Sequence, residues 1–367
     1  MEAKRVLIYR LGSLGDTVVA LPCFHLIART FPDAERRLLT NVPLSTKAAS
    51  PAFVLGDTRI VHSFMSYPVG LRNWAGLQRL SATIRAWNPD ILVYLAEARG
   101  LFGSFRDACF FLACGVKTIV GLPWRRDQRL HRWIVQGGFY EHEAARLARC
   151  LRQLGDARLD DCKSWDLRLS QDERTRAQEI LSKCPGKDNF IACCVGTKVD
   201  VNDWGIANWQ ALLGRLRKDS SAGLVLVGAS EEAALSTAAA LEWRGPAINL
   251  CGVTTPRETA AVLERAQLFI GHDSGPMHLA AAVGTRCVAV FSARHRPRIW
   301  FPYGDNHRVI YHHVPCEGCG LERCIRFKKI CIRSVDSNEV YEVITQLLSR
   351  TEMKHRTDSV KRCAWLT

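Results

Sequence analysis

The segment that most constrains the fold runs from Ala266 to Phe291 and reads as strand, loop, helix and strand. The apolar run 266–270 predicts the first strand, His278–Ala282 predicts the helix, and Cys287–Phe291 predicts the second strand. The loop between strand and helix therefore lies at the carboxyl end of a strand, where open α/β sheets bind their ligands.

This loop carries Asp273, Ser274 and Gly275, and His278 follows about one turn into the helix. Asp273 and Ser274 are residue types that cap helices, and Gly275 allows backbone N–H groups to approach a ligand closely. A helix start of this kind suits phosphate. The alternative for each residue alone is an ordinary helix cap with a packed histidine.

A second loop of this type, residues 10–16, follows the strand predicted over Arg5–Tyr9. The apolar segment Thr17–Phe31 after it has helical spacing. Gly12 and Gly15 form a G-x-x-G turn, which is not the dinucleotide-binding fingerprint. Asp16 is either a helix cap or a carboxylate held at the mouth of the sheet to accept a proton.

Strands and helices alternate in two blocks along the 367 residues, which indicates two doubly wound α/β domains facing each other across a cleft. The boundaries expected are 1–165 and 171–336, a last helix over 337–350 and a flexible tail over 351–367. The strands predicted are Arg5–Tyr9, Glu35–Thr40, Ile60–Phe64, Ile91–Tyr94, Thr118–Gly121, Phe190–Val195 and Gly223–Val227. The runs Ala247–Leu250, Ala260–Ala266 and Leu268–Ile270 continue the alternating series of strands and helices. The main helices predicted are Gly76–Trp87, Leu101–Ala113, Gln171–Lys183, Trp209–Leu216 and Glu231–Glu242.

The net charge of +14 suggests a polyanionic partner, although a general surface bias is an equal alternative. No nucleic-acid recognition motif is evident, so no nucleic-acid partner is expected. Most arginines between residues 125 and 152 are interpreted as a solvated helix face. The sequence has no apolar run long enough for a transmembrane span and no signal-peptide pattern, so a cytoplasmic protein is expected.

The chain contains 15 cysteines, most of them scattered through apolar runs where they act as small buried side chains. The exception is the C-x2-C-x4-C-x6-C series Cys316, Cys319, Cys324 and Cys331. Four thiolates at such spacing are compatible with a structural Zn or Fe site. A metal-free loop of reduced thiols is the alternative.

Together the two loops resemble glycosyltransferase family nine, the ADP-heptose:lipopolysaccharide heptosyltransferases. The resemblance rests on residues 10–16 with the following Ala20-Leu21-Pro22, and on Asp273 through Ala282 with the strand and the Ser292–Pro297 loop after it. It extends over about residues 4–348. It implies a GT-B fold, an acceptor in the first domain, a nucleotide sugar in the second, and a last helix that crosses back to the first domain.

One segment departs from the family pattern. Where the family places a phosphate-binding lysine before a Trp-Pro pair, this chain has Asn202, and Gly205 replaces the proline after Trp204. Lys198, four residues earlier, is the nearest substitute. Glu231 is expected to take the role of the family's ribose-binding acid.

The resemblance implies an inverting transfer of heptose from ADP-heptose to an anionic lipopolysaccharide-type acceptor, with Asp16 as general base and no required cofactor. The acceptor-side loop is expected to use Arg10, Gly12, Ser13 and Gly15. The donor is expected to meet Gly196, Thr197, Lys198, Glu231, Thr254, Asp273, Ser274, Gly275 and His278. Peripheral binding to the cytoplasmic face of the inner membrane fits the charge. The alternatives are a GT-B enzyme that uses another nucleotide sugar or a protein acceptor, and a metal- or nucleic-acid-binding protein without activity.

Overall fold

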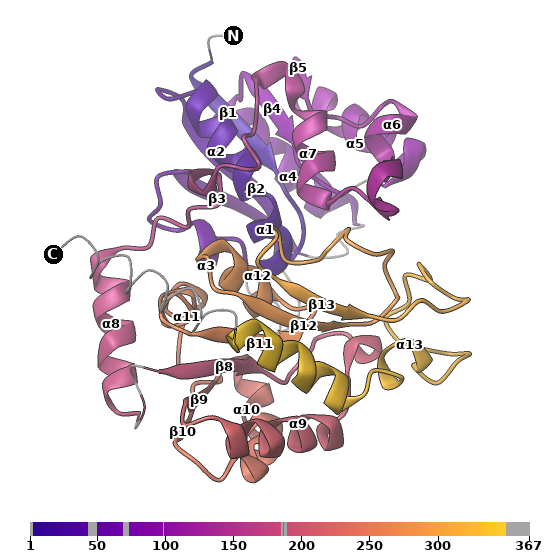
Figure 1. Ribbon diagram of the computed structural model, residues 1–367. Helices are drawn as coiled ribbons and strands as arrows, with labels where there is room; N and C mark the ends of the chain where they lie inside the picture. The colour runs from indigo at the N-terminus through magenta and orange to yellow at the C-terminus, as the bar shows by residue number, and fades with distance from the viewer. Residues whose placement is uncertain are drawn as a thin grey trace, which may run out of the picture.

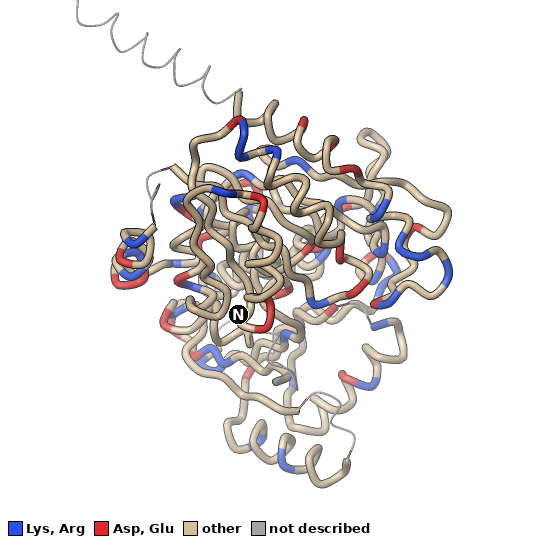
Figure 2. The backbone as a smooth tube through the Cα atoms, turned by 90° about the horizontal axis from the view of Figure 1, so that it is seen from below, with Lys and Arg blue, Asp and Glu red and all other residues tan. Residues whose placement is uncertain are grey.

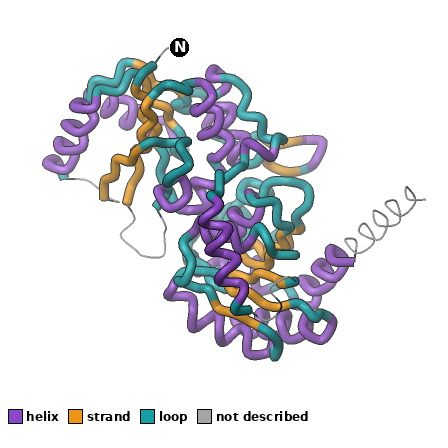
Figure 3. Tube along the Cα trace, turned by 90° about the vertical axis from the view of Figure 1, so that its left-hand side faces the viewer, coloured by secondary structure: helices purple, strands orange, loops and turns teal. Residues whose placement is uncertain are grey.

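The computed structural model of the chain describes residues 3–42, 50–68, 73–97, 99–184, 186 and 189–349. Its strands gather in two parallel sheets, each with helices packed against it, and the units built on them lie one above the other (Figure 1). A turned view shows the strands in two separate groups with helices between and around them (Figure 3). This arrangement confirms the doubly wound α/β architecture predicted from the sequence.

The first sheet has the strand order β3-β2-β1-β4-β5 and is parallel throughout. Its buried strands are short apolar runs, as expected for a parallel sheet covered on both faces. A small antiparallel pair, β6 and β7, follows it. The strands are β1 (Arg5–Tyr9), β2 (Glu35–Val42), β3 (Ser63–Pro68), β4 (Ile91–Tyr94), β5 (Thr118–Val120), β6 (Trp133–Ile134) and β7 (Phe139–Tyr140). The helices are α1 (Leu14–Val19), α2 (Leu21–Thr30), α3 (Ala52–Leu55), α4 (Trp74–Trp87), α5 (Gly100–Ala113), α6 (Arg126–Arg129) and α7 (Glu143–Cys150).

The second sheet repeats the plan with one more strand, in the order β10-β9-β8-β11-β12-β13. Helix α8 leads into it, and Ser170 begins that helix with a capping box. The strands are β8 (Phe190–Cys194), β9 (Gly223–Leu226), β10 (Ala247–Asn249), β11 (Leu268–His272), β12 (Cys287–Phe291) and β13 (Arg308–Tyr311). The helices are α8 (Gln171–Ser182), α9 (Ile206–Asp219), α10 (Ala233–Ala239), α11 (Pro256–Leu263), α12 (Gly275–Ala282) and α13 (Ile330–Arg333).

Both sheets change direction of winding at their first strand. In the first sheet β1 lies between β2 and β4, and in the second sheet β8 lies between β9 and β11. The loops that leave neighbouring strands at such a switch point diverge to opposite faces and open a crevice at the carboxyl edge. The loops after β1, β4, β8 and β11 are therefore the parts of this chain best placed to bind a ligand.

A last helix covers residues 337–349 of the described chain. Its apolar side chains Val340, Tyr341, Ile344 and Leu347 pack into the core of the second sheet, and Arg215 on α9 donates a hydrogen bond to Asn338. Within these residues the helix lies on the second unit, and the expected return to the first unit is not seen. The predicted flexible tail over 351–367 lies outside the described residues. None of the helices in the described part of the chain is both long and apolar enough to cross a bilayer.

One local prediction was wrong. The strand predicted over Ile60–Phe64 is β3 and begins at Ser63, because Ile60 and Val61 are buried in the turn before it. The run Ala260–Ala266 lies partly in helix α11, which starts at a capping box from Thr255 and ends at Leu263. Most arginines between residues 125 and 152 are exposed or half-buried, as expected, whereas Arg146 is buried and paired with Glu143.

Candidate active site

Asp16 lies at the carboxyl end of β1 and is the third residue of helix α1. Its carboxylate accepts two hydrogen bonds from Ser13, one from the backbone N–H at 2.6 Å and one from the hydroxyl at 3.0 Å. Arg10, which is fully buried, donates to the backbone oxygens of Asp16 and Leu95 and brings its guanidinium 3.8 Å from the Asp16 carboxylate. These contacts hold the carboxylate in place while 19% of the side chain stays exposed.

Gly12 is required by this arrangement for two reasons. Its φ of +114° is a backbone conformation that other residues rarely adopt, and a Cβ placed on it would lie 2.5 Å from the carboxyl carbon of Asp16. The predicted acceptor-side loop of Arg10, Gly12, Ser13 and Gly15 is therefore a compact cradle around Asp16.

Glu97 comes three residues after β4, the strand next to β1, and was not predicted as a site residue. Burial raises the pKa of its carboxyl group, and the nearby Asp16 carboxylate raises it further while Arg10 lowers it. Two carboxyl groups thus meet at the carboxyl edge of the first sheet, which we call the first mouth; the corresponding edge of the second sheet is the second mouth. The pairing of β1 with β4 brings these two groups together, and no sequence motif predicts that they are close.

Asp273 occupies the corresponding place in the second unit, directly after β11. Its side chain is 16% exposed, and burial raises its pKa to about 7, with the Asp16 charge acting in the same direction. Arg294 and Asn202 act in the opposite direction. The influence of Asp16 on Asp273 shows that the two mouths face each other.

Two glycines allow this close approach of the units. A Cβ on Gly15 would lie 2.9 Å from Cδ2 of His278, and a Cβ on Gly275 would lie 2.5 Å from Cδ2 of Leu14. Helices α1 and α12 therefore meet end to end, each with a glycine where the other presents a side chain. The sequence suggested both glycines as ligand-facing, but here they also fit the two loops together.

His278 is buried at this contact. Burial lowers the pKa of its imidazole to about 3, so the ring is neutral near pH 7. Its Nε2 lies 4.0 Å from an oxygen of Asp273, and the ring lines a cavity of about 10 Å³ together with His142, Trp165 and Tyr303. A space of this size holds about one water molecule. A neutral, buried ring in this position is better suited to orienting the loop than to carrying a charge to a phosphate.

The loop after β8 holds Gly196, Thr197 and Lys198. Thr197 shares hydrogen bonds with the backbone of Val199, and Lys198 is exposed. Asn202, at the position of the family's lysine, is buried: its amide donates to the backbone oxygen of Asp273 at 3.4 Å, and its oxygen accepts from Ser292 at 2.5 Å. Asn202 therefore ties the loop after β8 to the loops after β11 and β12.

Of the two adjacent acids after β9, Glu232 lies against Gly196 of this loop. Glu231 is exposed and accepts a hydrogen bond from Ser230. The Glu232 carboxylate accepts from the backbone N–H of Ala229, and a Cβ on Gly196 would lie 2.1 Å from its carboxyl carbon. The capping geometry of the short turn after β9 selects Glu232, and the Glu-Glu pair in the sequence was the available signal.

Two further predicted donor residues have local partners. Thr254, between β10 and α11, shares a hydrogen bond with Thr259 on α11. Ser274 begins α12 without a side-chain capping bond, and its hydroxyl lies 4.0 Å from the sulfur of Cys194 at the end of β8. Ser274 therefore lies between the loops after β8 and β11, whereas no contact links Thr254 to them among the described residues.

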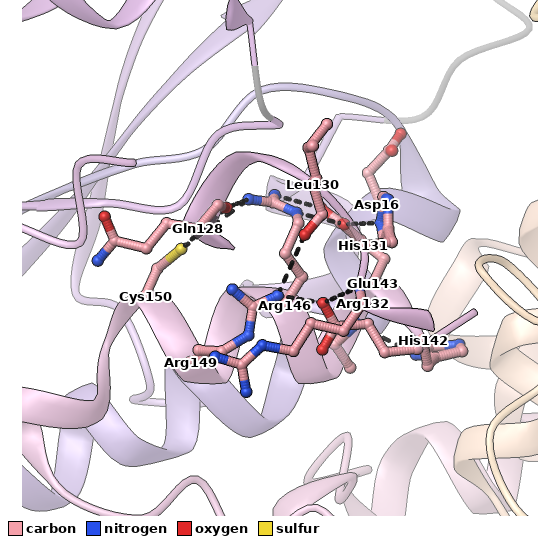
Figure 4. Close-up of polar contacts among 12 residues, drawn as sticks. Asp16, Gln128, Leu130, His131, Arg132, His142, Glu143, Arg146, Arg149 and Cys150 are labelled. Carbon is pink, nitrogen blue, oxygen red and sulfur yellow. Dashed lines mark hydrogen bonds and ion pairs between the residues drawn. The ribbon is translucent and has the colours of Figure 1, made fainter. Parts of the chain in front are cut away.

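Helix α7 brings a buried ion pair beneath the first mouth (Figure 4). Arg146 and Glu143, exposed by only 1% and 2%, are joined by hydrogen bonds of 2.7 and 2.6 Å, and Arg146 holds the pKa of Glu143 at about 2. His131 contacts the same carboxylate at 2.8 Å, and Arg146 reaches the backbone oxygen of Ala96, next to Glu97. This network was missed because its members are spread over 50 residues of sequence.

The start of α7 also links the two units. The backbone N–H of Glu143 donates to Ile299, and the His142 ring bonds the backbone oxygen of Phe301 at 2.9 Å. The start of α7, which carries the ion pair beneath the first mouth, is therefore also hydrogen-bonded to the second unit.

The predicted metal site is not assembled. All four cysteines are described, but neither they nor any other group of three or more His, Cys, Asp and Glu side chains in the described ranges is placed to hold a metal ion. Cys331 is buried while Cys319 is exposed, and burial together with the nearby Cys316, Cys319 and Cys324 raises the pKa of the Cys331 thiol. Backbone N–H groups of Lys329, Phe327 and Arg326 lower the pKa of Cys324.

Known proteins resemble the chain in sequence and in fold. The lipopolysaccharide core heptosyltransferase OpsX of Haemophilus influenzae is 21% identical over 315 residues, which is 84% of each chain. A family 9 glycosyltransferase from Veillonella parvula superposes with a TM-score of 0.71 at 18% identity, covering 95% of this chain and 98% of that one. Escherichia coli heptosyltransferase WaaC, solved with ADP-2-deoxy-2-fluoro heptose, gives 0.58 at 19% identity over 93% and 99%.

The two facing parallel sheets are those of the GT-B fold of these neighbours, as the sequence predicted. The family model described as glycosyltransferase family 9 (heptosyltransferase) matches residues 98–330, more than half of the chain. The chain is therefore a transferase that belongs to glycosyltransferase family 9, the heptosyltransferase family.

Proposed function

We propose that this chain transfers a heptose from ADP-heptose to a lipopolysaccharide core acceptor with inversion at the anomeric carbon. The observation that carries the proposal is the meeting of the Asp16 and Asp273 loops, each at the switch point of its sheet, across the contact of Gly15 with His278 and Gly275 with Leu14. A donor bound at one mouth would lie next to an acceptor bound at the other.

In this proposal the second unit, residues 171–336, binds the nucleotide sugar. A solved relative holds an ADP-heptose analogue, and the same fold here offers Thr197, Lys198, Ser274 and the start of α12 at neighbouring strand ends. Backbone N–H groups at a helix start and a lysine are suited to the two phosphates. We propose that Glu232, instead of Glu231, binds the ribose of the donor, because the Glu232 carboxylate lies against Gly196.

The first unit, residues 1–165, binds the acceptor. Asp16 takes the proton of the acceptor hydroxyl while that oxygen forms a bond to the anomeric carbon. The bond from that carbon to the donor phosphate breaks, and ADP leaves with the electron pair. One base is sufficient for inversion, and Arg294, Lys198 and the start of α12 supply positive potential for the leaving phosphate. Transfer by this route requires no cofactor.

Lys and Arg positions are distributed over both units (Figure 2), in keeping with the net charge of +14 and an anionic acceptor. We place the protein in the cytoplasm, in peripheral contact with the inner membrane, because relatives act on a lipopolysaccharide core. Nucleic acid has no role in this proposal.

A panel of donors tests the proposal. Thermal shift with ADP-heptose, UDP-glucose and GDP-mannose should show stabilisation by ADP-heptose, and a ligand at 100 times its dissociation constant adds about 2.7 kcal/mol. Preference for a UDP- or GDP-sugar would contradict the proposed donor and favour a GT-B enzyme of different specificity.

A further inference from the structure

Helix α5 exposes a row of large apolar side chains. Its buried side contains the core residues Ala108 and Phe111 together with Ser104 and Asp107, and the Tyr94 hydroxyl donates to Asp107 at 2.8 Å. Four apolar side chains on its outward side are exposed by 55% to 81%: Leu101, Phe102, Phe105 and Leu112. A helix on a soluble protein normally turns such residues inward.

These residues form one continuous face. Leu101, Phe105 and Cys109 are four residues apart, Leu112 follows three later, and Phe102 adjoins Leu101, so all lie on one side of the helix. Contiguous exposed apolar surface of this kind marks a binding site for a protein or a membrane. We call these five residues the α5 face.

Two arginines lie at the α5 face. Arg99 precedes the helix and Arg106 lies on its exposed side, both close to the buried Asp107. Apolar and aromatic side chains bordered by arginines are the composition of segments that lie in the interface of an anionic bilayer.

The α5 face begins at the mouth of the first sheet. Helix α5 starts three residues after Glu97, the residue next to Asp16. Helix α5 packs on the outside of this sheet (Figure 1). A membrane held by the α5 face would therefore lie beside the cradle of Asp16.

We propose that the α5 face docks the enzyme on an anionic lipid surface and so presents a lipid-anchored acceptor to Asp16. This inference rests on the proposed function for the identity of the acceptor, whereas the docking itself depends only on the α5 face. Phe102 and Phe105 insert among the lipid chains, and the arginines contact the acidic headgroups.

Sedimentation with vesicles tests the docking. Wild-type protein should bind vesicles of phosphatidylglycerol and phosphatidylethanolamine, bind phosphatidylcholine vesicles weakly, and lose affinity as salt rises. The double variant F102S/F105S should bind about 100-fold more weakly, about tenfold for each phenylalanine that leaves the lipid. The matched control I325S removes a side chain that is 75% exposed on the second unit and should bind within about twofold of wild type.

Failure of the wild type to bind anionic vesicles, or equal binding by F102S/F105S, would overturn the proposal. It would also be overturned if the wild type ignored vesicles and formed a dimer that F102S/F105S converts to a monomer, because the partner would then be a second copy. Transfer to a lipid-free core oligosaccharide should be unchanged in F102S/F105S. Absence of transfer by the wild type, with phenylalanine-dependent vesicle binding intact, would contradict the proposed function alone.

Discussion

The loops that carry Asp16 and Asp273 share a construction and differ in how they hold their carboxylates. Each loop leaves a central strand, contains a glycine fitted against the other loop, and opens a short helix. Their side chains are similarly exposed, 19% and 16%. Asp16 accepts two hydrogen bonds from Ser13 beside the Arg10 guanidinium, whereas Asp273 has its pKa raised to about 7 by burial.

The difference shows that hydrogen-bond donors and nearby charges, more than the exposed fraction of the side chain, make the two carboxyl groups chemically different. Donors within hydrogen-bond distance stabilise a charged carboxylate, and a desolvated carboxyl group without enough of them holds its proton. The first mouth is suited to accept a proton from a substrate. The second is suited to bind polar groups and phosphates that the protein itself leaves unpaired.

The largest effect should come from the first mouth. Asp16→Asn keeps an oxygen for Ser13 but removes the base, so turnover should fall about 10²- to 10⁴-fold. Donor affinity, measured by calorimetry, should stay near the wild-type value. Asp33→Asn, an exposed acid in the same unit, is the matched control. Near-normal turnover in Asp16→Asn would reduce Asp16 to a helix cap.

Protonation of Asp273 in the second mouth should make the free energy of unfolding depend on pH. The pKa of Asp273 rises from 3.8 to about 7 on folding, so between these values the folded protein keeps a proton that the unfolded chain has lost. Stability should therefore fall as pH rises from about 4 to 7, by at most about 4 kcal/mol for this shift. In chemical denaturation without ligand, Asp273→Asn should lose this slope. A parallel pH profile for wild type and variant would contradict the assigned cause.

Donor binding should also depend on Asp273. Above pH 7, where the Asp273 carboxyl group has lost its proton, a charged hydrogen bond contributes about 1.5–3 kcal/mol, so Asp273→Ala should weaken ADP-heptose binding about 10- to 150-fold. Asp305→Ala, which removes an exposed acid of the same unit, should bind normally. If Asp273→Ala weakened acceptor binding instead, the two mouths would have been assigned in the wrong order.

A substitution at Gly12 tests whether turnover depends on the position of the Asp16 carboxylate. Gly12→Ala and its control Gly115→Ala both place alanine at positive φ and should each cost about 1–2 kcal/mol of stability. Only the new methyl group of Gly12→Ala clashes with the Asp16 carboxylate, so this variant alone should lower turnover, by about 10- to 100-fold. Equal turnover in the two variants would mean that Asp16 tolerates displacement.

The smallest effect is expected for Lys198. Lys198→Ala should weaken ADP binding about tenfold by calorimetry, because an exposed ammonium contributes less than a buried one. Lys218→Ala, on α9, is the control. Unchanged ADP affinity in Lys198→Ala would mean that backbone groups and Arg294 hold the phosphates without a lysine.

The sequence predicted the alternation of strands and helices and both mouth loops, because apolar period and glycine placement are local signals. It placed β3 three residues early, since a buried turn has the same kind of apolar run as a strand. Glu97 and the Glu143–Arg146 pair were missed because strand order, not local sequence, brings them to Asp16. Glu232 was missed because a turn of the backbone decides which of two adjacent acids faces Gly196.

Asn202 shows what a family pattern cannot reveal. The sequence showed only that the family's lysine is missing at Asn202, whereas the structure gives the asparagine a structural role between Asp273 and Ser292. The cysteine series had the spacing of a metal site, yet spacing does not fix side-chain geometry, and in the described residues the four thiols are near one another without forming a group placed to hold a metal ion. Both cases depend on tertiary contacts that no motif contains.

The central claim is tested most directly by incubating the wild-type enzyme with ADP-heptose and a heptose-deficient lipopolysaccharide core. Mass spectrometry should show one heptose added for each ADP released, and NMR of the product should show the anomeric configuration opposite to that of the donor. An unmodified core with intact ADP-heptose would contradict the proposed reaction. Transfer with retained configuration would contradict the role of Asp16 as the base of a single displacement.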